Sequence, residues 1–425
     1  MKLLIRNGRV IDPASKLDAE SDILIEDGRI SRVKGKIKDR ANRVIDAKGC
    51  FVMPGFIDLH VHLRDPGFEE KETVATGAKA AARGGFTTIL AMPNTRPVVD
   101  NADVVNYVHQ KAKNLAPVNV LQIGAVTKGQ EGKKLADIHQ MVQAGIPAIS
   151  EDGKSVMNTG LYYQAMQMAR AEGIPVFAHC EDKNLMHGGV VNAGKRAKEL
   201  GLPGISNDVE DVITARDILL AESVGVHLHL CHCSTRKSVW MVKQAKENGI
   251  AVTAEACPHH FTLCEDDIAA DNSNYKMNPP LRTAEDMEAI REGLRKGIID
   301  VIATDHAPHT AVEKGQSMKR APFGIVGLET AAAITYSELV LKDYLTPMQM
   351  AEKLSYNPAK VIGLEKGTLQ EGSIADIVIF DPNQNYTIAA KEFAGKAKNT
   401  PFDKRKVTGK VMMTIVSGEI VYSEE

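Results

Sequence analysis

The sequence predicts an α/β protein, a (β/α)8 TIM-like barrel with a small β-sandwich domain formed by both termini. Between residues 51 and 363, eight short apolar runs alternate with helix-like stretches. Both ends of the chain instead carry β-rich stretches with turn dipeptides. Eight β-then-α units fit a parallel barrel ringed by helices. We therefore expect the barrel at residues 51–363 and the small β domain at residues 1–50 and 364–425.

The expected barrel strands are short apolar runs bounded by polar or turn residues. They are Gly55–Leu63, Thr87–Met92, Val118–Ala125, Pro147–Ser150, Ile174–Ala178, Val226–Cys231, Ile250–Ala254 and Ile298–Thr304. The helix-like stretches between them include Glu72–Gly84, Ala102–Asn114, Leu161–Glu172 and Asp208–Ser223. Because such barrels build their active sites at the C-terminal ends of the strands, polar residues at those ends are the candidates for a site.

The terminal β domain is expected from hairpin signals at both ends of the chain. Asn7-Gly8 and Asp27-Gly28 each lie between β-rich stretches, and the stretches 407–411 and 417–421 repeat the pattern in the tail. Neither flank alone would bury much of a core. We therefore expect one domain made jointly by both termini, rather than two independent appendages.

The composition excludes several classes of protein. The 425 residues are 44% hydrophobic with a formal net charge of -2, which gives no general attraction to nucleic acid or to an anionic membrane. Lys2 and Arg6 interrupt the first apolar stretch, and no run approaches the roughly 18 to 20 apolar residues that span a bilayer. The six cysteines show no Cys-x-x-Cys spacing and fit reduced thiols. We expect a cytoplasmic protein.

The first expected strand carries two histidines on one face. Strand alternation puts Asp58, His60, His62 and Arg64 on one side and the apolar residues between them on the other. Two imidazoles on one face indicate a metal site. For the His-x-His pattern alone, a pair of hydrogen-bonded core histidines is an equally good alternative.

Later strands also end on residues that bind metals or move protons. These residues are His179, His232 and Asp305, and Asp305 is followed by His306 and His309. Four histidines and a carboxylate at strand ends predict one metal site at a single rim of the barrel. The neighbouring Cys180, Cys231 and Cys233 are better explained as small buried hydrophobic residues than as ligands. The same caution applies to the remaining histidines of these segments, which are His227, His229, His259 and His260.

Two metal ions held close together need an anionic bridge, and the fourth strand is followed by candidates for it. Among the residues of Ile149–Lys154 we favour Asp152. A bridging carboxylate fits the ligand chemistry of zinc. The alternative is that Asp152 caps the helix that follows.

These residues resemble the dihydroorotases of the amidohydrolase superfamily. The likeness rests on the stretches Met53–Gly67, Met92–Thr95 and Ala303–His309, and it covers nearly the whole chain. The His-x-His pair alone resembles a feature of the whole superfamily. Arg64, Asn94 and His309 make the resemblance to dihydroorotases much more specific.

The resemblance implies two zinc ions per chain and a role for each ligand. His60, His62 and Asp305 would hold one ion, His179 and His232 the other, and Asp152 would bridge them together with a hydroxide. Metal coordination lowers the pKa of water from about 15.7 toward about 7, which makes hydroxide available at neutral pH. Asp305 would act as the general acid and base of the reaction. Many relatives use a carboxylated lysine as the bridge, so a modified Lys154 is the alternative to Asp152.

The implied reaction is the reversible cyclisation of N-carbamoyl-L-aspartate to L-dihydroorotate in pyrimidine synthesis. Both compounds carry a carboxylate outside the reacting bond, and an arginine meets a carboxylate with two parallel hydrogen bonds. The substrate-binding residues implied by the resemblance are His62, Arg64, Asn94, Asn278, His309, Phe323 and Gly324. Alternatives remain for two of them, because Arg64 could pair with Asp58 or Asp65, and Asn278 could cap a turn.

Two other functions compete with this one. A related cyclic amidase of the dihydropyrimidinase, hydantoinase or allantoinase type would use the same metal centre, but its neutral substrate would leave Arg64 without a partner. An inactive scaffold would have no need of the complete ligand set. For partners, the resemblance implies a homodimer or an association with aspartate carbamoyltransferase. The polar segment 307–328 is either a mobile lid or an ordinary solvated loop.

Overall fold

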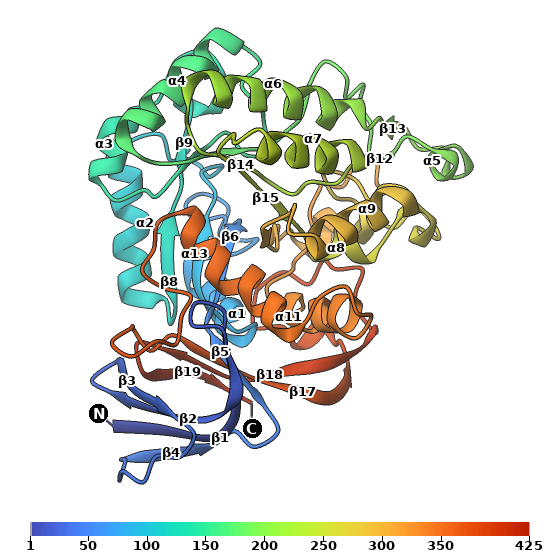
Figure 1. Cartoon of the computed structure of the whole chain (residues 1–425). Coiled ribbons are helices and arrows are strands. Elements are labelled where there is room, and N and C mark those ends of the chain that lie inside the picture. Colours follow the sequence, from blue (N-terminus) through green and yellow to red (C-terminus); the bar gives the residue numbers. More distant parts are fainter. Residues whose placement is uncertain (1, 425) are drawn as a thin grey trace.

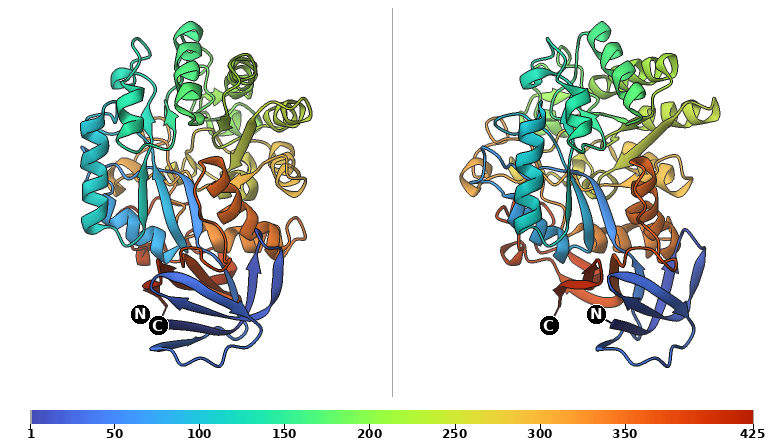
Figure 2. Two further views of the ribbon diagram at one scale, coloured as in Figure 1. Left: turned by 60° about the vertical axis from the view of Figure 1, so that its left-hand side comes forward. Right: turned by 90° about the vertical axis from the view of Figure 1, so that its left-hand side faces the viewer.

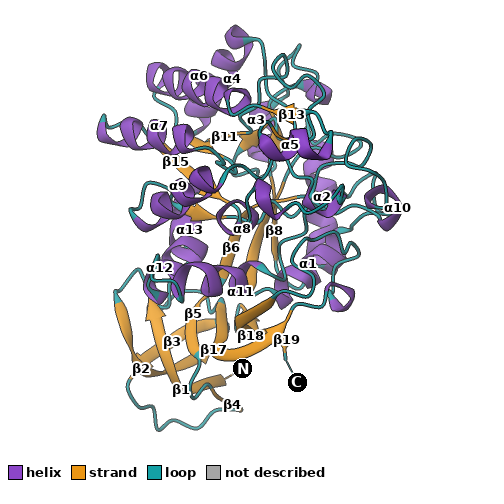
Figure 3. Cartoon of the chain, turned by 90° about the vertical axis from the view of Figure 1, so that its right-hand side faces the viewer, coloured by secondary structure: helices purple, strands orange, loops and turns teal. Residues whose placement is uncertain are grey.

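A computed structural model describes residues 2–424, arranged as a barrel with a sheet beneath it (Figure 1). The barrel strands run through the middle of the molecule, and helices cover their outer side (Figure 3). The two chain ends meet in the sheet at the bottom, with the N- and C-termini on the same part of the molecule (Figure 2). None of the helices in this described part has the length and apolar character that a membrane crossing needs.

The barrel has its strands where the apolar runs predict them. The strands are β6 (Phe56–Val61), β7 (Phe86–Ala91), β8 (Asn119–Gln122) with β9 (Gly124–Ala125), β10 (Ile149–Ser150), β11 (Val176–Ala178), β14 (Leu228–Leu230), β15 (Val252–Ala256) and β16 (Val301–Ile302). All neighbouring pairs are parallel. A parallel bridge between Val61 and His306 joins the first strand to the segment after the last, and His62 N donates to His306 O at 2.9 Å. The ring is thereby closed.

The α-helices of the described residues are α1 (Val74–Arg83), α2 (Ala102–Leu115), α3 (Ile138–Gln143), α4 (Thr159–Glu172), α5 (Lys195–Leu200), α6 (Asp208–Val224), α7 (Arg236–Glu247), α8 (Pro258–Thr262), α9 (Ala284–Arg295), α10 (Ala311–Lys314), α11 (Ala331–Thr335), α12 (Pro347–Ala351) and α13 (Asn357–Val361). The four for which the sequence predicts bounds are α1, α2, α4 and α6, and they begin and end close to those bounds. Capping side chains define several starts, as at Thr73, Asn101 and Thr235. A short separate pair of strands, β12 (Val191–Asn192) and β13 (Gly204–Ile205), lies in the connection before α6.

The termini share one eight-stranded sheet, as expected. Its strands are β1 (Lys2–Asp12), β2 (Leu17–Glu26), β3 (Arg29–Lys34), β4 (Arg43–Asp46), β5 (Phe51–Pro54), β17 (Ile377–Thr387), β18 (Lys406–Val416) and β19 (Glu419–Ser423). The sheet folds over on itself, because Ile30 N donates to Ser373 O at 2.9 Å and residues of both termini enclose one apolar core. β5 belongs to this sheet, which therefore extends beyond the expected boundary at residue 50.

The prediction of a hairpin turn at Asn7-Gly8 is wrong. Asn7 and Gly8 lie inside β1, at a shift of register against β2, and form a bulge instead of a turn. A Cβ on Gly8 would come within 2.4 Å of Val52 Cγ2, so the glycine serves the close approach of β5. Asp27-Gly28 does form the turn between β2 and β3, with both residues at positive φ. In the tail, the stretch 407–411 lies inside β18, while Ser417-Gly418 turns the chain into β19.

Gly55 lies where the terminal sheet meets the barrel, and its substitution tests how tightly these two parts pack. Its N donates to Asp376 O at 2.9 Å, and a Cβ there would lie 2.3 Å from the side chain of the buried Thr87. We expect Gly55→Ala to lower the free energy of unfolding by about 1–3 kcal/mol through overpacking. Thermal unfolding measures this. The matched control is Gly35→Ala, because nothing lies within 4 Å of a Cβ at the exposed Gly35; equal midpoints for the two variants would contradict the expectation.

Candidate metal centre and substrate pocket

The expected metal ligands come together at one rim of the barrel. His60 lies on β6 and His62 follows it, while Asp152, His179, His232 and Asp305 follow β10, β11, β14 and β16. All six side chains are buried. His232 and Asp305 have positive φ values of 32° and 46°, a conformation unfavourable for such residues. Strain of this kind is found where a side chain must be aimed into a functional site.

Asp152 lies between the two pairs of histidines. Its Oδ1 is 3.3 Å from His60 Nε2, 3.5 Å from His179 Nδ1 and 3.7 Å from His232 Nε2. Its Oδ2 is 3.4 Å from His62 Nε2. One carboxylate that reaches four imidazoles occupies the position that a bridge between two cations requires.

The alternative bridge, Lys154, is turned away from this centre. Its side chain is exposed, and Nζ donates to Gln130 O at 3.0 Å. Asp152 also does not cap the next helix, since α4 begins with Asn158 as its capping residue. The geometry therefore favours the aspartate over both alternatives.

Asp305 faces the first pair of histidines. Its Oδ1 is 3.1 Å from His62 Nε2 and 3.5 Å from His60 Nε2. Burial alone would raise the pKa of Asp305, but the nearby imidazoles of His60 and His62 outweigh it and lower the pKa to about 2. Burial likewise opposes ionisation of Asp152, but the neighbouring imidazoles of His60, His179 and His232 outweigh it and hold the pKa of Asp152 well below its usual range. Both carboxylates are ionised at neutral pH.

The donor set fits bound cations. Three overlapping groups have ligand atoms within 4.8 Å of one another, namely His60 with His62 and Asp152, His60 with His232 and Asp305, and Asp152 with His179 and His232. His60 Nε2 and Asp152 Oδ1 are buried and have no hydrogen-bond partner. Leaving such atoms unpaired costs about 1–3 kcal/mol each, which a metal ion would offset. Imidazole and carboxylate ligands at this density suit zinc.

Three further residues hold the histidines from behind. His60 Nδ1 lies 2.7 Å from Glu255 Oε1, His62 Nδ1 lies 2.9 Å from Asn94 Oδ1, and His179 Nε2 lies 3.4 Å from Glu181 Oε2. Such partners fix the ring orientation and the nitrogen that remains for a metal. The sequence patterns did not predict Glu255 and Glu181 as part of the site. Glu255 stands inside an apolar strand, a signal that would have revealed it if β15 had been extended beyond residue 254.

The expected substrate residues line one cavity beside the ligands. The cavity has a volume of about 310 Å³, and its walls include His62, Arg64, Asn94, Asn278, His309 and Phe323 together with Asp152, His179, His232 and Asp305. Gly324 is not among its walls; its N donates to Lys276 O at 2.9 Å. A Cβ on Gly324 would meet Ala307 O at 2.5 Å, so the glycine serves backbone packing next to Phe323.

Arg64 keeps its charge available in this cavity. Of its two alternative partners, Asp65 pairs with Lys111 at 2.8 Å, and Asp58 Oδ1 accepts from the backbone N of His60 and Thr304 at 3.1 Å. Arg64 Nε instead donates to Pro308 O at 3.3 Å, and Nη2 lies 3.3 Å from His309 Nε2. Burial and the charge of Arg64 lower the pKa of His309 to about 3, so this imidazole is neutral. The cavity thus offers a cation to an anionic ligand.

Asn278 and Phe323 reach the cavity from two neighbouring loops. Asn278 Nδ2 donates to Glu181 Oε2, the same oxygen that lies near His179. Lys314 Nζ donates to Pro322 O at 3.1 Å and to Gly324 O at 2.9 Å, which fastens the loop around Phe323. Whether segment 307–328 closes over a ligand stays a prediction.

Comparison with known proteins shows the same family throughout the chain. Residues 49–238 match a family model described as Dihydro-orotase-like. The chain is 49% identical to the dihydroorotase of Pelotomaculum thermopropionicum, with 100% of this chain and 99% of that protein covered. It is also 49% identical to the dihydroorotase of Clostridioides difficile, with 99% and 100% covered. Among solved structures, the L-hydantoinase (dihydropyrimidinase) from Arthrobacter aurescens superposes with a TM-score of 0.90 at 29% identity, covering 99% of this chain and 96% of that one.

Glu255 gives a direct test of the metal centre. We expect Glu255→Gln to weaken metal binding about 10- to 100-fold, because the charge behind the His60 ring is lost while the side chain keeps its size. Competition with a chelator measures the change. Glu222→Gln on the exposed side of α6 serves as the control. Metal retention equal to that of the unsubstituted protein would show that Glu255 has no part in holding the ligand.

Proposed function

The chain belongs to the dihydroorotase family, and we propose that Arg64 and Asp305 carry the family's reaction in it. It is a metal-dependent cyclic amide hydrolase of pyrimidine synthesis that interconverts N-carbamoyl-L-aspartate and L-dihydroorotate. One observation supports these roles most strongly. The guanidinium of Arg64, which donates to the carbonyl of Pro308 and lies beside the neutral His309, lines the same cavity as Asp305 and the histidines.

Substrate binding is proposed to begin with the carboxylate outside the reacting bond. The guanidinium of Arg64 would pair with it, and Asn94 and His309 would complete the clamp from two other walls of the cavity. Asn278 and the backbone near Phe323 would contact the ring on its other side. These contacts fix the ring so that its amide carbonyl faces the ligand cluster.

The metal is proposed to be zinc, with two ions per chain. His60, His62 and Asp305 would hold one ion, His179 and His232 the other, and Asp152 would lie between them. Bound zinc would polarise the amide carbonyl and lower the pKa of a water from about 15.7 toward about 7. Cobalt and manganese also accept such ligands, so elemental analysis is needed to identify the metal.

The proton is proposed to move through Asp305. In hydrolysis the bond between ring carbonyl carbon and ring nitrogen breaks, so a proton must leave the attacking water and reach that nitrogen. Asp305, which is ionised beside the histidines, would accept the proton from the attacking water and donate it to the ring nitrogen. In cyclisation the same carboxylate would take the proton from the ureido nitrogen as water is lost.

The two competing functions fit less well. The hydantoinase is similar in fold, but its identity of 29% is well below the 49% shared with dihydroorotases. A neutral ring would also leave the Arg64 charge without a partner in the cavity. An inactive scaffold is disfavoured because the ligand set is complete and its atoms converge.

Location and assembly extend the same proposal. We place the protein in the cytoplasm, since all six cysteines are free and five of them are buried.

For assembly we retain both a homodimer and an association with aspartate carbamoyltransferase. Leu219 on α6 and Trp240 on α7, which are 64% and 60% exposed, offer apolar surface for such a contact. Light scattering alone and with that partner would distinguish the two.

The Arg64→Met variant tests the carboxylate clamp. We expect kcat/KM for L-dihydroorotate to fall about 100-fold, since losing about 2.8 kcal/mol of charge-assisted hydrogen bonding corresponds to two factors of ten. Bound zinc should be unchanged. Turnover of dihydrouracil, hydantoin and allantoin is measured in parallel. A preference for one of these neutral rings, or indifference to the loss of Arg64, would favour another cyclic amidase.

The Asp152→Ala variant tests the bridge. We expect loss of most activity together with loss of bound metal, because both ions would share this carboxylate. Lys154→Ala is the matched control and should keep both, since its ammonium points to Gln130. If the lysine variant loses its metal while the aspartate variant keeps it, the bridge is the lysine.

A further inference from the structure

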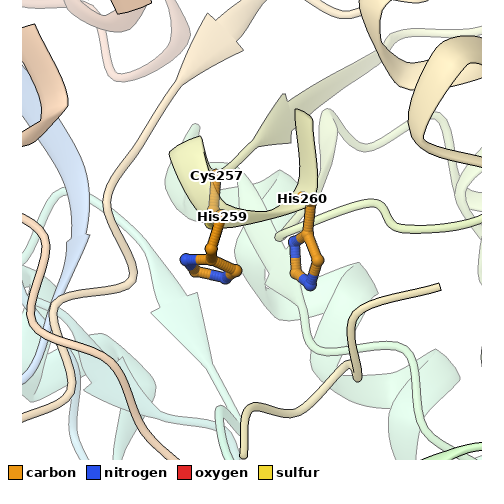
Figure 4. A group of neighbouring side chains, drawn as sticks. All are labelled: Cys257, His259 and His260. Atoms are coloured by element: carbon orange, nitrogen blue, oxygen red, sulfur yellow. The ribbon is translucent and has the colours of Figure 1, made fainter. Parts of the chain in front are cut away.

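A second group of ligand-type side chains lies on the turn after β15, outside the residues proposed for catalysis. Figure 4 shows His259 and His260 on the short helix α8 and Cys257 directly before it, with the two imidazole rings side by side on the same side of the ribbon. The ring centroids are 4.3 Å apart. The sequence favours core roles for both histidines, whereas the structure places them together with a thiol.

The three side chains are close enough to share one ion. Each offers a ligand atom, and these atoms lie within 4.8 Å of one another. Zinc bonds of about 2.3 Å to sulfur and about 2.0–2.1 Å to nitrogen put tetrahedral ligands about 3.4–3.6 Å apart. Small side-chain rotations would bring ligand atoms that now lie within 4.8 Å of one another to that spacing. The exposed fractions are 0% for Cys257, 1% for His259 and 3% for His260, so the group is shielded from bulk water.

The histidines of this group present unpaired nitrogens. His259 Nε2 and His260 Nδ1 are buried without a hydrogen-bond partner. His260 Nε2 lies 2.9 Å from Pro279 O, so it carries the proton and leaves the lone pair on Nδ1. An orphaned buried acceptor costs about 1–3 kcal/mol. A bound ion would satisfy both nitrogens at once.

The thiol is also free to act as a ligand. Cys257 is the residue before the first turn of α8, yet its side chain makes no capping hydrogen bond. Thiolate and imidazole together are the ligands that select zinc and other borderline or soft ions. The other cysteine-containing group, His60 with Cys231 and Glu255, shares His60 with the catalytic cluster and so does not form an independent site.

We propose that Cys257, His259 and His260 form a further metal site, which takes a zinc ion through one sulfur and two nitrogens. Binding forms one Zn–S and two Zn–N bonds, and the thiol proton leaves to solvent. A water completes the fourth position. The ion fastens the α8 turn, which follows the last barrel strand before β16. The site takes no part in the proposed amide chemistry, so its failure would leave the dihydroorotase assignment untouched.

Cobalt substitution tests this site with a signal that the proposed catalytic ligands do not give. The catalytic ligands are nitrogen and oxygen only, whereas cobalt bound to a thiolate shows a sulfur-to-metal charge-transfer band in the near ultraviolet. We expect the cobalt-loaded full-length protein to show that band and to hold about three ions per chain. Cys257→Ser should abolish the band and lower the content to about two.

Two control variants make the result specific. Cys231→Ser removes the thiol near His60, and Cys50→Ser removes the half-buried thiol of the terminal sheet; both should keep the band. A band that disappears in Cys231→Ser instead would overturn the proposal. So would an unsubstituted protein with no band and about two ions, a result that decides the matter even if Cys257→Ser fails to fold. His260→Gln, which keeps the thiol, should shift the band and weaken cobalt binding.

Discussion

The closure of the barrel is the constraint on which the rest of the molecule depends. Its first and last strands meet through the Val61 and His306 bridge, with His62 N donating to His306 O. This backbone bond places His62 next to Asp305, although 243 residues separate them. Parallel strands that close in this way present all their C-terminal ends at one rim. The ligand cluster is therefore a consequence of closure, with each strand supplying one or two groups to a common centre.

The charged side chains buried at that rim need polar partners on the side away from the cavity. Two carboxylates and four imidazoles are buried together, and such groups are stable only when each is paired. Glu255 illustrates the solution, because it faces His60 Nδ1 at 2.7 Å and His229 Nε2 at 3.0 Å, and accepts from His232 N at 3.1 Å. One glutamate thus orients a ligand ring, a core histidine and the backbone of a second ligand. The inward-facing nitrogens are left for cations.

Much of this arrangement follows from sequence patterns, and the failures have physical causes. Apolar runs locate the barrel strands because a parallel sheet is buried on both faces. The hairpin prediction at Asn7-Gly8 failed because this dipeptide occurs in bulges as well as in turns. Which of the two forms depends on the packing of Gly8 against Val52, a contact that the local sequence does not contain. Glu181 was missed because an acceptor for a histidine is recognised by its position in space, and Glu255 because the expected strand ended at residue 254. His259 and His260 look like ordinary core histidines until their unpaired nitrogens are seen.

The choice of substrate within this fold depends on very few atoms. A TM-score of 0.90 with a hydantoinase means that the backbone framework does not distinguish the two chemistries. What distinguishes them must lie on the cavity wall, and Arg64 is the residue there whose charge has no carboxylate opposite it at hydrogen-bond distance. Arg64 has a φ of 60°, so the backbone is held in an unfavourable conformation to aim this side chain. A site built to pair a buried charge rejects a ligand that lacks the partner, because the charge is then left desolvated and unpaired. We therefore propose that the strained Arg64, rather than the ligand cluster, selects between neutral and anionic rings.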